Sequence, residues 1–553
     1  MTEAMTTTVG GYLLQRLQEH GVGHIFGVPG DFVLSFMHEI EQSQLQLINT
    51  CDEQGAGFAA DAYARLKGLG VVCVTYGVGG LKVANTTGQA YAEKSPVVVI
   101  SGAPSMDERR RNPLIHHKVR SYDTQFRVFQ QLTAAATVLE VPEDAGREID
   151  RVLGIAKHHS LPVYIELPRD TIDCQVDSPG APATTITESD RQTLAAAVAE
   201  AIEWINRAER PVIVFGIELD RFGLQDLVMQ FIDNSGIPTT VTLLDKGTVQ
   251  ERHDSFLGVY AGALGRDDVR EYVEGSDCLI MLGTLLTDMN LGIYTARLDP
   301  ARCIHATRDR LAIGLHTFER VRLEDFVAGL AGPGVVRRHV GDHPRAPLPE
   351  DAGVMVGGSD EAITIDRLFC RLESFLTDEM IVIADPGDAL FASIDLPVQG
   401  ARAFLAPAFY ASLGYAVPAA IGAQCALPDA RPLVLVGDGA FQMTGVELST
   451  CARFGLDPIV IVLNNGGYTT ERLILEGAFN DIQPWDYSKL PALLGAGRSC
   501  VVKTVGDLET ALDAASVRDG QFFLIDVRLD KMDVSPALMR LGERLKRAAT
   551  VGV

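Results

Sequence analysis

Short apolar runs bounded by turn residues alternate with amphipathic segments along the whole chain, and this pattern limits the fold more than any other feature. Runs such as Val71–Tyr76 and Leu433–Val436 are typical of buried strands, and segments such as Leu194–Arg207 have helical spacing. Buried strands separated by helices indicate parallel sheets covered by helices on both faces. We therefore predict an α/β fold of doubly wound parallel sheets. The other predicted elements are the strands Val97–Ile100, Val163–Leu167, Val212–Phe215, Leu279–Leu282, Ile381–Ala384 and Ile459–Leu463, and the helix Ile363–Leu376.

The chain has 553 residues, too many for one hydrophobic core, since a domain holds about 150 residues. Two stretches interrupt the alternation of strands and helices, namely Val176–Asp190 and Val335–Asp360, both rich in Pro and Gly. Such stretches are typical of interdomain linkers. We predict three α/β domains at 1–178, 190–335 and 360–553. The central domain has no GxGxxG motif, so we expect a Rossmann-like scaffold without a bound dinucleotide.

The formal charge of −24 argues against nucleic acid or an anionic membrane as the main partner, because phosphate binding requires basic patches. An anionic ligand must then be held by local devices, such as a metal ion or a helix N-terminus. The nine cysteines occur singly without a CxxC pair, and no apolar run reaches the ~18 residues of a membrane span. The polar N-terminus lacks the apolar segment of a secretory signal. We expect a cytoplasmic protein with reduced thiols.

Two polar motifs follow predicted strands of the third domain. One strand leads into Gly437-Asp438-Gly439-Ala440 and a helical pattern from about Thr444, and the next ends in Asn464-Asn465-Gly466-Gly467-Tyr468. Asp438 and Asn465 are 27 positions apart, which suits a parallel βαβ crossover that brings both strand ends to the carboxyl edge of the sheet. Glycines let the backbone approach an anion. A carboxylate, an amide oxygen and a backbone carbonyl are hard ligands suited to Mg²⁺.

This GDG…NN pattern resembles the signature of thiamine-diphosphate-dependent enzymes. The likeness to one family of them, the pyruvate, indolepyruvate and phenylpyruvate decarboxylases, covers essentially the whole chain. The resemblance implies pyrimidine-binding, central and diphosphate-binding domains in that order, and Mg²⁺ ligands at Asp438, Asn465 and the carbonyl of Gly467. It further implies thiamine diphosphate as cofactor and non-oxidative decarboxylation of a 2-oxo acid to an aldehyde and CO₂.

The same resemblance identifies candidate catalytic residues. Glu53, in Cys51-Asp52-Glu53-Gln54-Gly55, matches the family's glutamate against the aminopyrimidine ring, whereas Asp52 is explained as an acid at a helix start. Four further residues match a polar cluster over the thiazolium ring that manages protons, namely Asp31, His116, His117 and Glu471. A second pair, His158-His159, ends a helical segment, where cationic side chains have a sufficient structural explanation.

A further stretch, Ala411-Ser412-Leu413-Gly414, matches the segment that bends the cofactor in relatives. The resemblance makes Leu413 the bulky wedge and places the carbonyl of Ala411 on the cofactor's amino group. On periodicity alone Leu413 is a core leucine. The cofactor-binding residues that the resemblance implies are Glu53, Gly387, Asp388, Ala411, Leu413, Gly437, Asp438, Gly439, Ala440, Asn465, Gly467 and Tyr468.

The sequence departs from the family near the start of the third domain, where relatives often carry Thr followed by Gly-Asp-Ser-Trp-Phe. Pro386 occupies the Thr position, so any hydrogen bond from that side chain is lost. Leu390 occupies the Trp position and leaves space over the reacting carbon, which favours an aromatic or bulky substrate such as phenylpyruvate or indolepyruvate. We expect Met289 and Ile474 to line the same substrate pocket and to refill part of it.

Two alternatives stay open. A carboligase such as acetolactate synthase uses the same cofactor, but such enzymes usually lack the histidine pair and the glutamate at position 471. A catalytically silent homologue is disfavoured because Glu53, Asp438 and Asn465 are all present. In relatives, the glutamate of the first domain and the metal ligands of the third come from different subunits. The resemblance therefore implies a homodimer, or a tetramer built as a dimer of dimers, with active sites between subunits.

Overall fold

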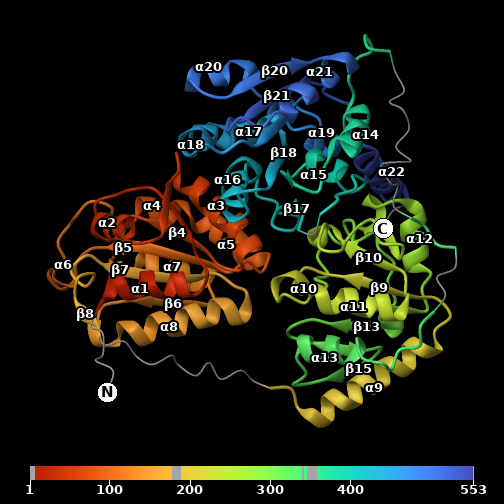
Figure 1. Cartoon of the computed structure of the whole chain (residues 1–553), viewed down its shortest axis with the longest axis horizontal. Coiled ribbons are helices and arrows are strands. Elements are labelled where there is room, and N and C mark those ends of the chain that lie inside the picture. Colours follow the sequence, from red (N-terminus) through yellow and green to blue (C-terminus); the bar gives the residue numbers. More distant parts are fainter. Residues whose placement is uncertain (1–6, 177–187, 339–341, 346–357, 401, 552–553) are drawn as a thin grey trace.

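The computed structural model describes residues 7–176, 188–338, 342–345, 358–400 and 402–551, which form three α/β domains around three large sheets (Figure 1). The two predicted linkers lie largely outside the described residues, so the boundaries 1–178, 190–335 and 360–553 stay a prediction. Each predicted strand and helix is present, with ends shifted by a few residues. The predicted three-domain, doubly wound α/β architecture is confirmed.

The first sheet has the order β3 (Gln46–Asn49), β2 (His24–Gly27), β4 (Gly70–Val74), β5 (Val97–Ala103), β7 (Val163–Pro168) and β6 (Ala135–Val138). A small antiparallel pair joins β1 (Thr7–Thr8) to β8 (Gln175–Val176). The helices of this domain are α1 (Val9–Glu19), α2 (Leu34–Gln42), α3 (Glu53–Lys67), α4 (Val78–Lys82), α5 (Ala84–Ala92), α6 (Met106–Arg111), α7 (Thr124–Leu132) and α8 (Pro142–His159).

The third sheet has the order β17 (Phe404–Leu405), β16 (Met380–Ala384), β18 (Arg431–Gly437), β19 (Ile459–Asn464), β21 (Phe523–Arg528) and β20 (Arg498–Val502). Its helices are α14 (Ile365–Phe375), α15 (Asp388–Ala392), α16 (Ala416–Ala426), α17 (Asp438–Thr444), α18 (Leu448–Phe454), α19 (Thr469–Ile474), α20 (Leu490–Leu494), α21 (Val505–Ser516) and α22 (Pro536–Val551). The helix after the GDG motif thus begins at Asp438, earlier than the predicted Thr444, because the glycine and alanine that follow Asp438 already belong to its first turn.

The first and third sheets share one topology. Every neighbouring pair of strands in both is parallel, and β2, β4 and β5 occupy the positions of β16, β18 and β19. In each sheet the chain first runs to one edge strand, β3 or β17, and then crosses back to the other side. This reversal creates a crevice at the carboxyl ends of the central strands, where open α/β sheets bind ligands.

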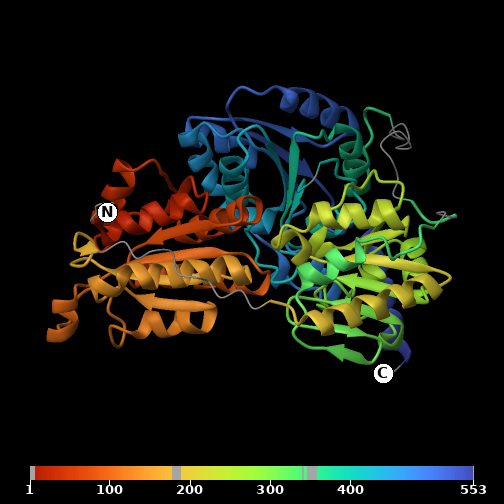
Figure 2. The same ribbon diagram turned by 60° about the horizontal axis from the view of Figure 1, so that its bottom comes forward.

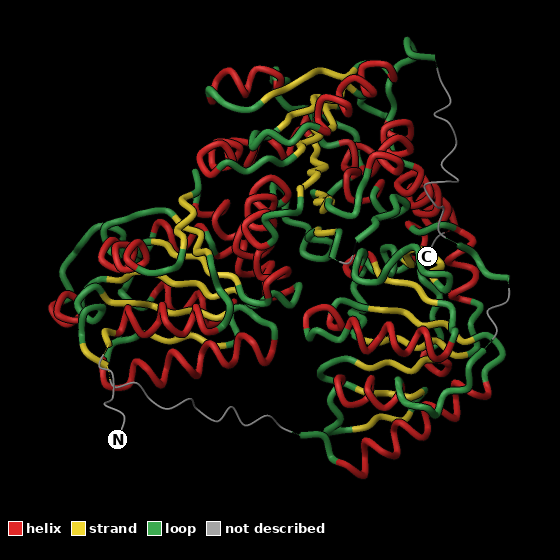
Figure 3. Tube along the Cα trace, in the orientation of Figure 1, coloured by secondary structure: helices red, strands yellow, loops and turns green. Residues whose placement is uncertain are grey.

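The central sheet was predicted to be parallel, and this is wrong for one edge of it. The strands of this sheet and the helices around them lie below the third domain in Figure 3. Its order is β11 (Phe256–Tyr260), β10 (Thr239–Thr242), β9 (Pro211–Phe215), β12 (Cys278–Leu282), β13 (Cys303–Ala306), β14 (Leu311–Ile313) and β15 (His316–Phe318). The last two strands are antiparallel to their neighbours, because the short connections before them leave no length for a crossover helix. The helices are α9 (Arg191–Arg207), α10 (Glu218–Arg221), α11 (Gln225–Ser235), α12 (Asp267–Glu274) and α13 (Leu323–Leu330).

The first and third domains share a hydrophobic core. Along β18, Val434 and Val436 face this shared core, whereas Leu433 and Leu435 face the core that continues into the central domain. Both faces of the strand are therefore buried, which explains its continuous apolar run. Helices α3 and α16 pack against each other in the shared core and join the two domains (Figures 1 and 2).

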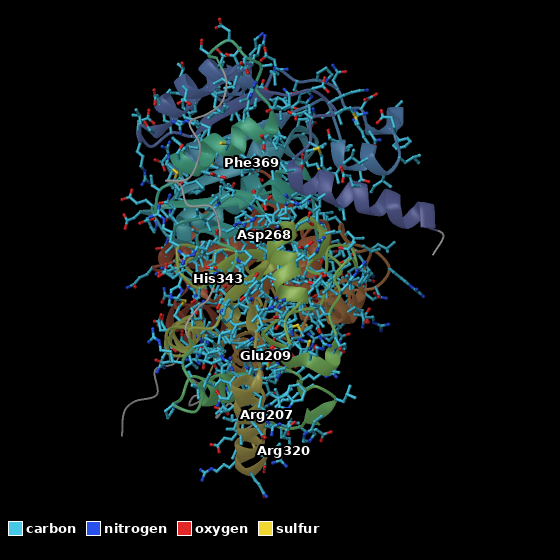
Figure 4. All side chains as sticks on the ribbon, turned by 90° about the vertical axis from the view of Figure 1, so that its right-hand side faces the viewer. Arg207, Glu209, Asp268, Arg320, His343 and Phe369 are labelled. Carbon is cyan, nitrogen blue, oxygen red and sulfur yellow. The ribbon has the colours of Figure 1, made fainter. Side chains whose placement is uncertain are left out.

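The third domain also rests on the central domain. The side view places Phe369 of α14 above Asp268 of α12 and Arg207 of α9 (Figure 4). Arg540 of α22 donates hydrogen bonds to the main-chain oxygen of Leu264 in the central domain. Among the described helices, none is both long and apolar enough to cross a membrane.

Candidate active site

A cavity of about 280 Å³ lies at the carboxyl ends of β16, β18 and β19. Loops that follow these three strands form most of its wall, and the central domain contributes Met289. The cavity thus occupies the crevice where the strand order of the third sheet reverses. The predicted site residues on its wall are Gly387, Asp388, Leu390, Ala411, Leu413, Gly437, Gly439, Ala440, Asn465, Gly467, Tyr468 and Glu471.

The three predicted metal ligands converge at this edge of the sheet. The carboxylate of Asp438 accepts the amide hydrogens of Gly439 at 2.8 Å and Gly466 at 2.6 Å, which ties the first motif to the second. Burial raises the pKa of Asp438 to about 6, against the effect of these donors. The side-chain oxygen of Asn465 is buried, and none of the residues that the structure describes donates a hydrogen bond to it. Burying an amide oxygen without a partner lowers the stability of the folded protein, so a ligand that binds this oxygen would recover part of that free energy.

The loop that carries Asn465 depends on a glycine. Gly467 has φ of +145°, and a Cβ at this position would stand 1.9 Å from the main-chain oxygen of Asn480. Any side chain would therefore displace the loop and the carbonyl that it presents. The donor set of a carboxylate, an unsatisfied amide oxygen and a main-chain carbonyl fits Mg²⁺, which prefers hard oxygen ligands and keeps positions for phosphate and water.

A buried acid that the sequence analysis left without a role holds another wall of the cavity. Asp385, directly after β16, accepts the amide hydrogens of Gly414 at 2.9 Å and Ala416 at 2.8 Å. These bonds fix the segment that presents Ala411 and Leu413, and Ala411 has the unusual φ of +58°. Burial raises the pKa of Asp385 to about 7. Its position after a strand end, like that of Asp438, is the signal that could have identified it.

Asp388 lines the cavity, but its carboxylate forms hydrogen bonds with Ser535. One oxygen accepts the amide hydrogen of Ser535 at 2.8 Å, and the other accepts the hydroxyl of the same residue. The pair anchors the start of α22, and burial raises the pKa of Asp388 to about 6. Both carboxylate oxygens of Asp388 are therefore already hydrogen-bonded within the third domain, and its predicted contact with a cofactor stays a prediction.

The predicted substrate pocket is partly assembled. Leu390 is fully buried, and it lines the cavity together with Met289. Ile474 instead has 74% of its surface exposed and lies outside the residues that line the cavity. Within one chain, therefore, the structure brings Leu390 and Met289 together but does not add Ile474.

The first domain carries its own polar cluster at the carboxyl ends of its strands. Asp31 and His116 form a 2.6 Å hydrogen bond between the carboxylate and Nε2, and the ring of His117 lies edge-on at 4.7 Å from that of His116. The buried ring of Phe32 stacks on His116 at 5.0 Å and fixes its plane. The structure therefore joins Asp31 and both histidines, as predicted from sequence positions about 85 residues apart. The other pair, His158-His159, ends α8, where His158 accepts a hydrogen bond from Arg308 of the central domain.

Glu53 is the first residue of α3. The preceding Asp52 caps the helix by accepting the amide hydrogen of Gln54 at 2.8 Å, as the sequence analysis expected for this acid. Lys82 of α4 lies 2.8 Å from the Glu53 carboxylate and also pairs with Asp52. The carboxylate of Glu447, in the third domain, accepts the amide hydrogens of Cys51 and Asp52 at 3.1 and 3.0 Å.

The two sets of predicted residues stay apart in a single chain. The residues that line the cavity come from the central and third domains, and Asp31, Glu53, His116 and His117 are absent from its described wall. Glu447, which accepts hydrogen bonds from the main chain just before Glu53, follows α17, whereas Asp438 begins that helix. Within the described part of one chain, the candidate residues therefore form two separate groups, or candidate half-sites: the polar residues of the first domain and the cavity of the third.

Comparison with known proteins agrees with this organisation. Three models of thiamine pyrophosphate enzymes match in order: the N-terminal TPP binding domain at residues 7–125, the central domain at 198–326 and the C-terminal TPP binding domain at 387–527. The match of both binding domains makes the protein a thiamine diphosphate enzyme.

Proteins that are similar over nearly the whole chain indicate which family of thiamine diphosphate enzymes this is. The indole-3-pyruvate decarboxylase of Azospirillum brasilense is 38% identical over 542 residues, covering 97% of this chain and 98% of the relative. An alpha-keto-acid decarboxylase of Mycobacterium tuberculosis (strain ATCC 25618 / H37Rv) is 34% identical over 97% of this chain and 96% of the relative. Another, from Mycobacterium avium (strain 104), is 33% identical over 98% of both. The chain belongs to the thiamine-diphosphate-dependent 2-oxo acid decarboxylase family.

Proposed function

We propose that this protein converts a 2-oxo acid with an aromatic or bulky branched side chain to an aldehyde and CO₂, with thiamine diphosphate and Mg²⁺. The observation that carries the proposal is one cavity lined both by Asn465 and Gly467, two of the proposed metal ligands, and by the apolar side chains of Leu390 and Met289. A buried apolar wall favours a larger apolar side chain by about 0.8 kcal/mol per buried CH₂. The activity named for the relative from Azospirillum brasilense, on indole-3-pyruvate, supports a bulky substrate.

In this proposal the third domain holds the cofactor. Asp438, the side-chain oxygen of Asn465 and the carbonyl of Gly467 would hold Mg²⁺, which would supply positive charge to offset that of the diphosphate. Leu413 and Ala411 line the same cavity, where Leu413 would support the cofactor and the carbonyl of Ala411 would accept a hydrogen bond from its amino group. The bound cofactor supplies the electron sink for decarboxylation, and the protein supplies position and proton transfer.

The first domain supplies the proton-transfer groups, but from a second copy of the chain. Glu53 would exchange a proton with the pyrimidine ring, while Asp31, His116 and His117, with Glu471 of the third domain, handle protons at the reacting carbon. Large apolar side chains are exposed near both half-sites: Leu34 (52%) and Val78 (53%) in the first domain, and Met443 (49%) and Val446 (50%) in the third. We propose that they are covered in a homodimer, or in a tetramer of two such dimers, whose active sites lie between subunits.

We also propose a cytoplasmic location. All nine cysteines are free, and five of them are buried, as is usual for reduced intracellular thiols: Cys73, Cys278, Cys303, Cys425 and Cys451.

The test is a panel of phenylpyruvate, indolepyruvate, 2-oxoisocaproate and pyruvate, assayed with purified protein, thiamine diphosphate and Mg²⁺ under one set of conditions. We expect aldehyde and CO₂, with a higher kcat/KM for the bulky acids than for pyruvate. Acyloin as the main product would indicate a carboligase, and no turnover with the cofactor bound would indicate a silent homologue. Pyruvate as the best of the four would contradict the enlarged pocket.

Leu390→Trp provides the matched check of the substrate proposal. The larger ring fills the space over the reacting carbon, so the variant should lose roughly ten- to hundredfold more kcat/KM for the aromatic acids than for pyruvate. Equal losses for all four acids would show that Leu390 does not select the substrate.

A further inference from the structure

The ionic partner of Glu53 is a lysine from its own domain. The Lys82 ammonium lies 2.8 Å from Oε2 of Glu53 and also contacts Asp52, and these two acids raise the pKa of Lys82. Lys82 is the last residue of α4, so its backbone is held by that helix. The lysine is half exposed, whereas only 13% of the Glu53 side chain is exposed in one chain. The ion pair therefore restrains the orientation of a carboxylate whose side chain is already mostly buried.

The backbone under Glu53 is restrained as well. Glu447 of the third domain, almost fully buried, accepts the amide hydrogens of Cys51 and Asp52, so that it fixes the turn before α3. Gly55, in the first turn of that helix, leaves room for it, since a Cβ there would stand 2.1 Å from Oε1 of Glu447. With the helix start held in this way, the side-chain torsions of Glu53 are the main freedom that remains.

The two carboxylate oxygens of Glu53 have different surroundings. Oε2 is occupied by Lys82. Oε1 faces Gly79, where a Cβ would lie 3.2 Å away, and no described group forms a hydrogen bond or ion pair with this oxygen. The absence of a side chain at Gly79 thus keeps one oxygen accessible while the other is held.

We propose that Lys82 is a positioning residue for Glu53: it holds Oε2 and thereby directs Oε1 to the pyrimidine ring of thiamine diphosphate bound by a neighbouring subunit. This inference rests on the proposed role of Glu53. The lysine itself transfers no proton. Its contribution is orientation, because a hydrogen-bond partner that is misplaced by about 1 Å can cost up to roughly a hundredfold in rate.

The test uses the full-length holoenzyme with Mg²⁺ and two readouts besides turnover. The first is the dissociation constant of thiamine diphosphate, and the second is the rate at which the C2 proton of the bound cofactor exchanges with D₂O. Lys82→Met should slow C2 exchange by roughly tenfold or more, with the dissociation constant changed by less than about threefold. Lys82→Arg, which keeps a cation at the same place, should restore most of the exchange rate. Lys489→Met serves as the control, because Lys489 is 81% exposed and its ion pair within the described part of the chain is with nearby Asp486.

A second arm separates orientation from folding. In Lys82→Ala, added ethylammonium should accelerate C2 exchange, because a small cation can occupy the space of the lost side chain. An unchanged exchange rate in Lys82→Met would overturn the proposal, as would faster exchange with tighter cofactor binding, which would make Lys82 a competitor of the cofactor. Equal loss of exchange and cofactor affinity without rescue by Arg or ethylammonium would show a merely structural role. Glu53→Gln separates the proposed role of Lys82 from that of Glu53. Rapid exchange of the C2 proton in that variant would refute the proton-transfer role of Glu53 on which the inference about Lys82 rests.

Discussion

Asp438 has a buried negative charge and Asn465 a buried amide oxygen, and a bound cation would interact favourably with both. The carboxylate of Asp438 is buried without a cationic side chain among its described hydrogen-bond partners, and the amide oxygen of Asn465 accepts no hydrogen bond from the described residues. We predict that Asp438→Ala loses thiamine diphosphate during gel filtration in Mg²⁺, because the loss of a charged ligand weakens metal binding by at least ~10–100-fold. Wild-type protein should lose the cofactor only in EDTA, and Asp513→Ala, an exposed acid on α21, should behave like wild type. Retention by Asp438→Ala equal to that of wild type would contradict the metal site.

Asp385 predicts a pH dependence of stability. Burial raises its pKa from 3.8 to about 7, so between these values the folded chain binds more protons than the unfolded chain. Its contribution to the free energy of unfolding is therefore fully present below about pH 4 and is lost as the pH rises towards 7. Asp385→Asn stays neutral and lacks this loss. In cofactor-free protein, the Tm of the variant minus that of wild type should increase from pH 4 to pH 7, and a constant or decreasing difference would refute the assignment.

Helices α3 and α16 pack closely against each other and join the first domain to the third. Gly422 of α16 lies against the backbone of α3, and a Cβ there would stand 1.9 Å from the main-chain oxygen of Ala59. Gly→Ala inside a helix normally stabilises by roughly 0.5–1 kcal/mol, but forced overpacking costs about 1–3 kcal/mol. We predict that Gly422→Ala lowers the Tm, whereas Gly358→Ala, with open space around the added methyl group, leaves it unchanged. An unchanged or raised Tm for Gly422→Ala would show that the two helices can separate without cost.

The elements also show what the sequence could predict. Strands buried on both faces, such as β18, were predictable because their apolar runs are continuous, and the GDG and NN motifs were predictable because each follows such a strand. The antiparallel hairpin of β14 and β15 was missed, since strands of three residues are too short for a periodic pattern. The role of Asp385 was missed because its partners are main-chain amides about 30 positions away, which no side-chain pattern marks.

In the whole molecule, the catalytic residues predicted in the first domain are not among the described residues that line the cavity of the third. Local motifs predicted the residues of both candidate half-sites, but only the packed structure shows that Glu53, at the start of α3, is not among the described residues that line the cavity beside Asp438. In the proposed account, a single chain has every candidate group, but its two candidate half-sites do not combine with each other. Two chains related by a twofold axis would complete two sites at once, because each offers one half-site of either kind.

Mixing two inactive variants tests this account most directly. Glu53→Gln lacks the proton-transfer group of the first domain, and Asp438→Ala lacks the metal ligand of the third. We predict that each variant alone has less than about 1% of wild-type decarboxylation of phenylpyruvate, since general acid–base catalysis contributes about 10²–10⁴-fold. Co-refolded or co-expressed, the two should form mixed dimers with one intact site each and regain up to about a quarter of wild-type CO₂ release, as random pairing leaves half of the dimers mixed. No recovery in proven mixed dimers would contradict active sites built from Glu53 of one chain and Asp438 of another.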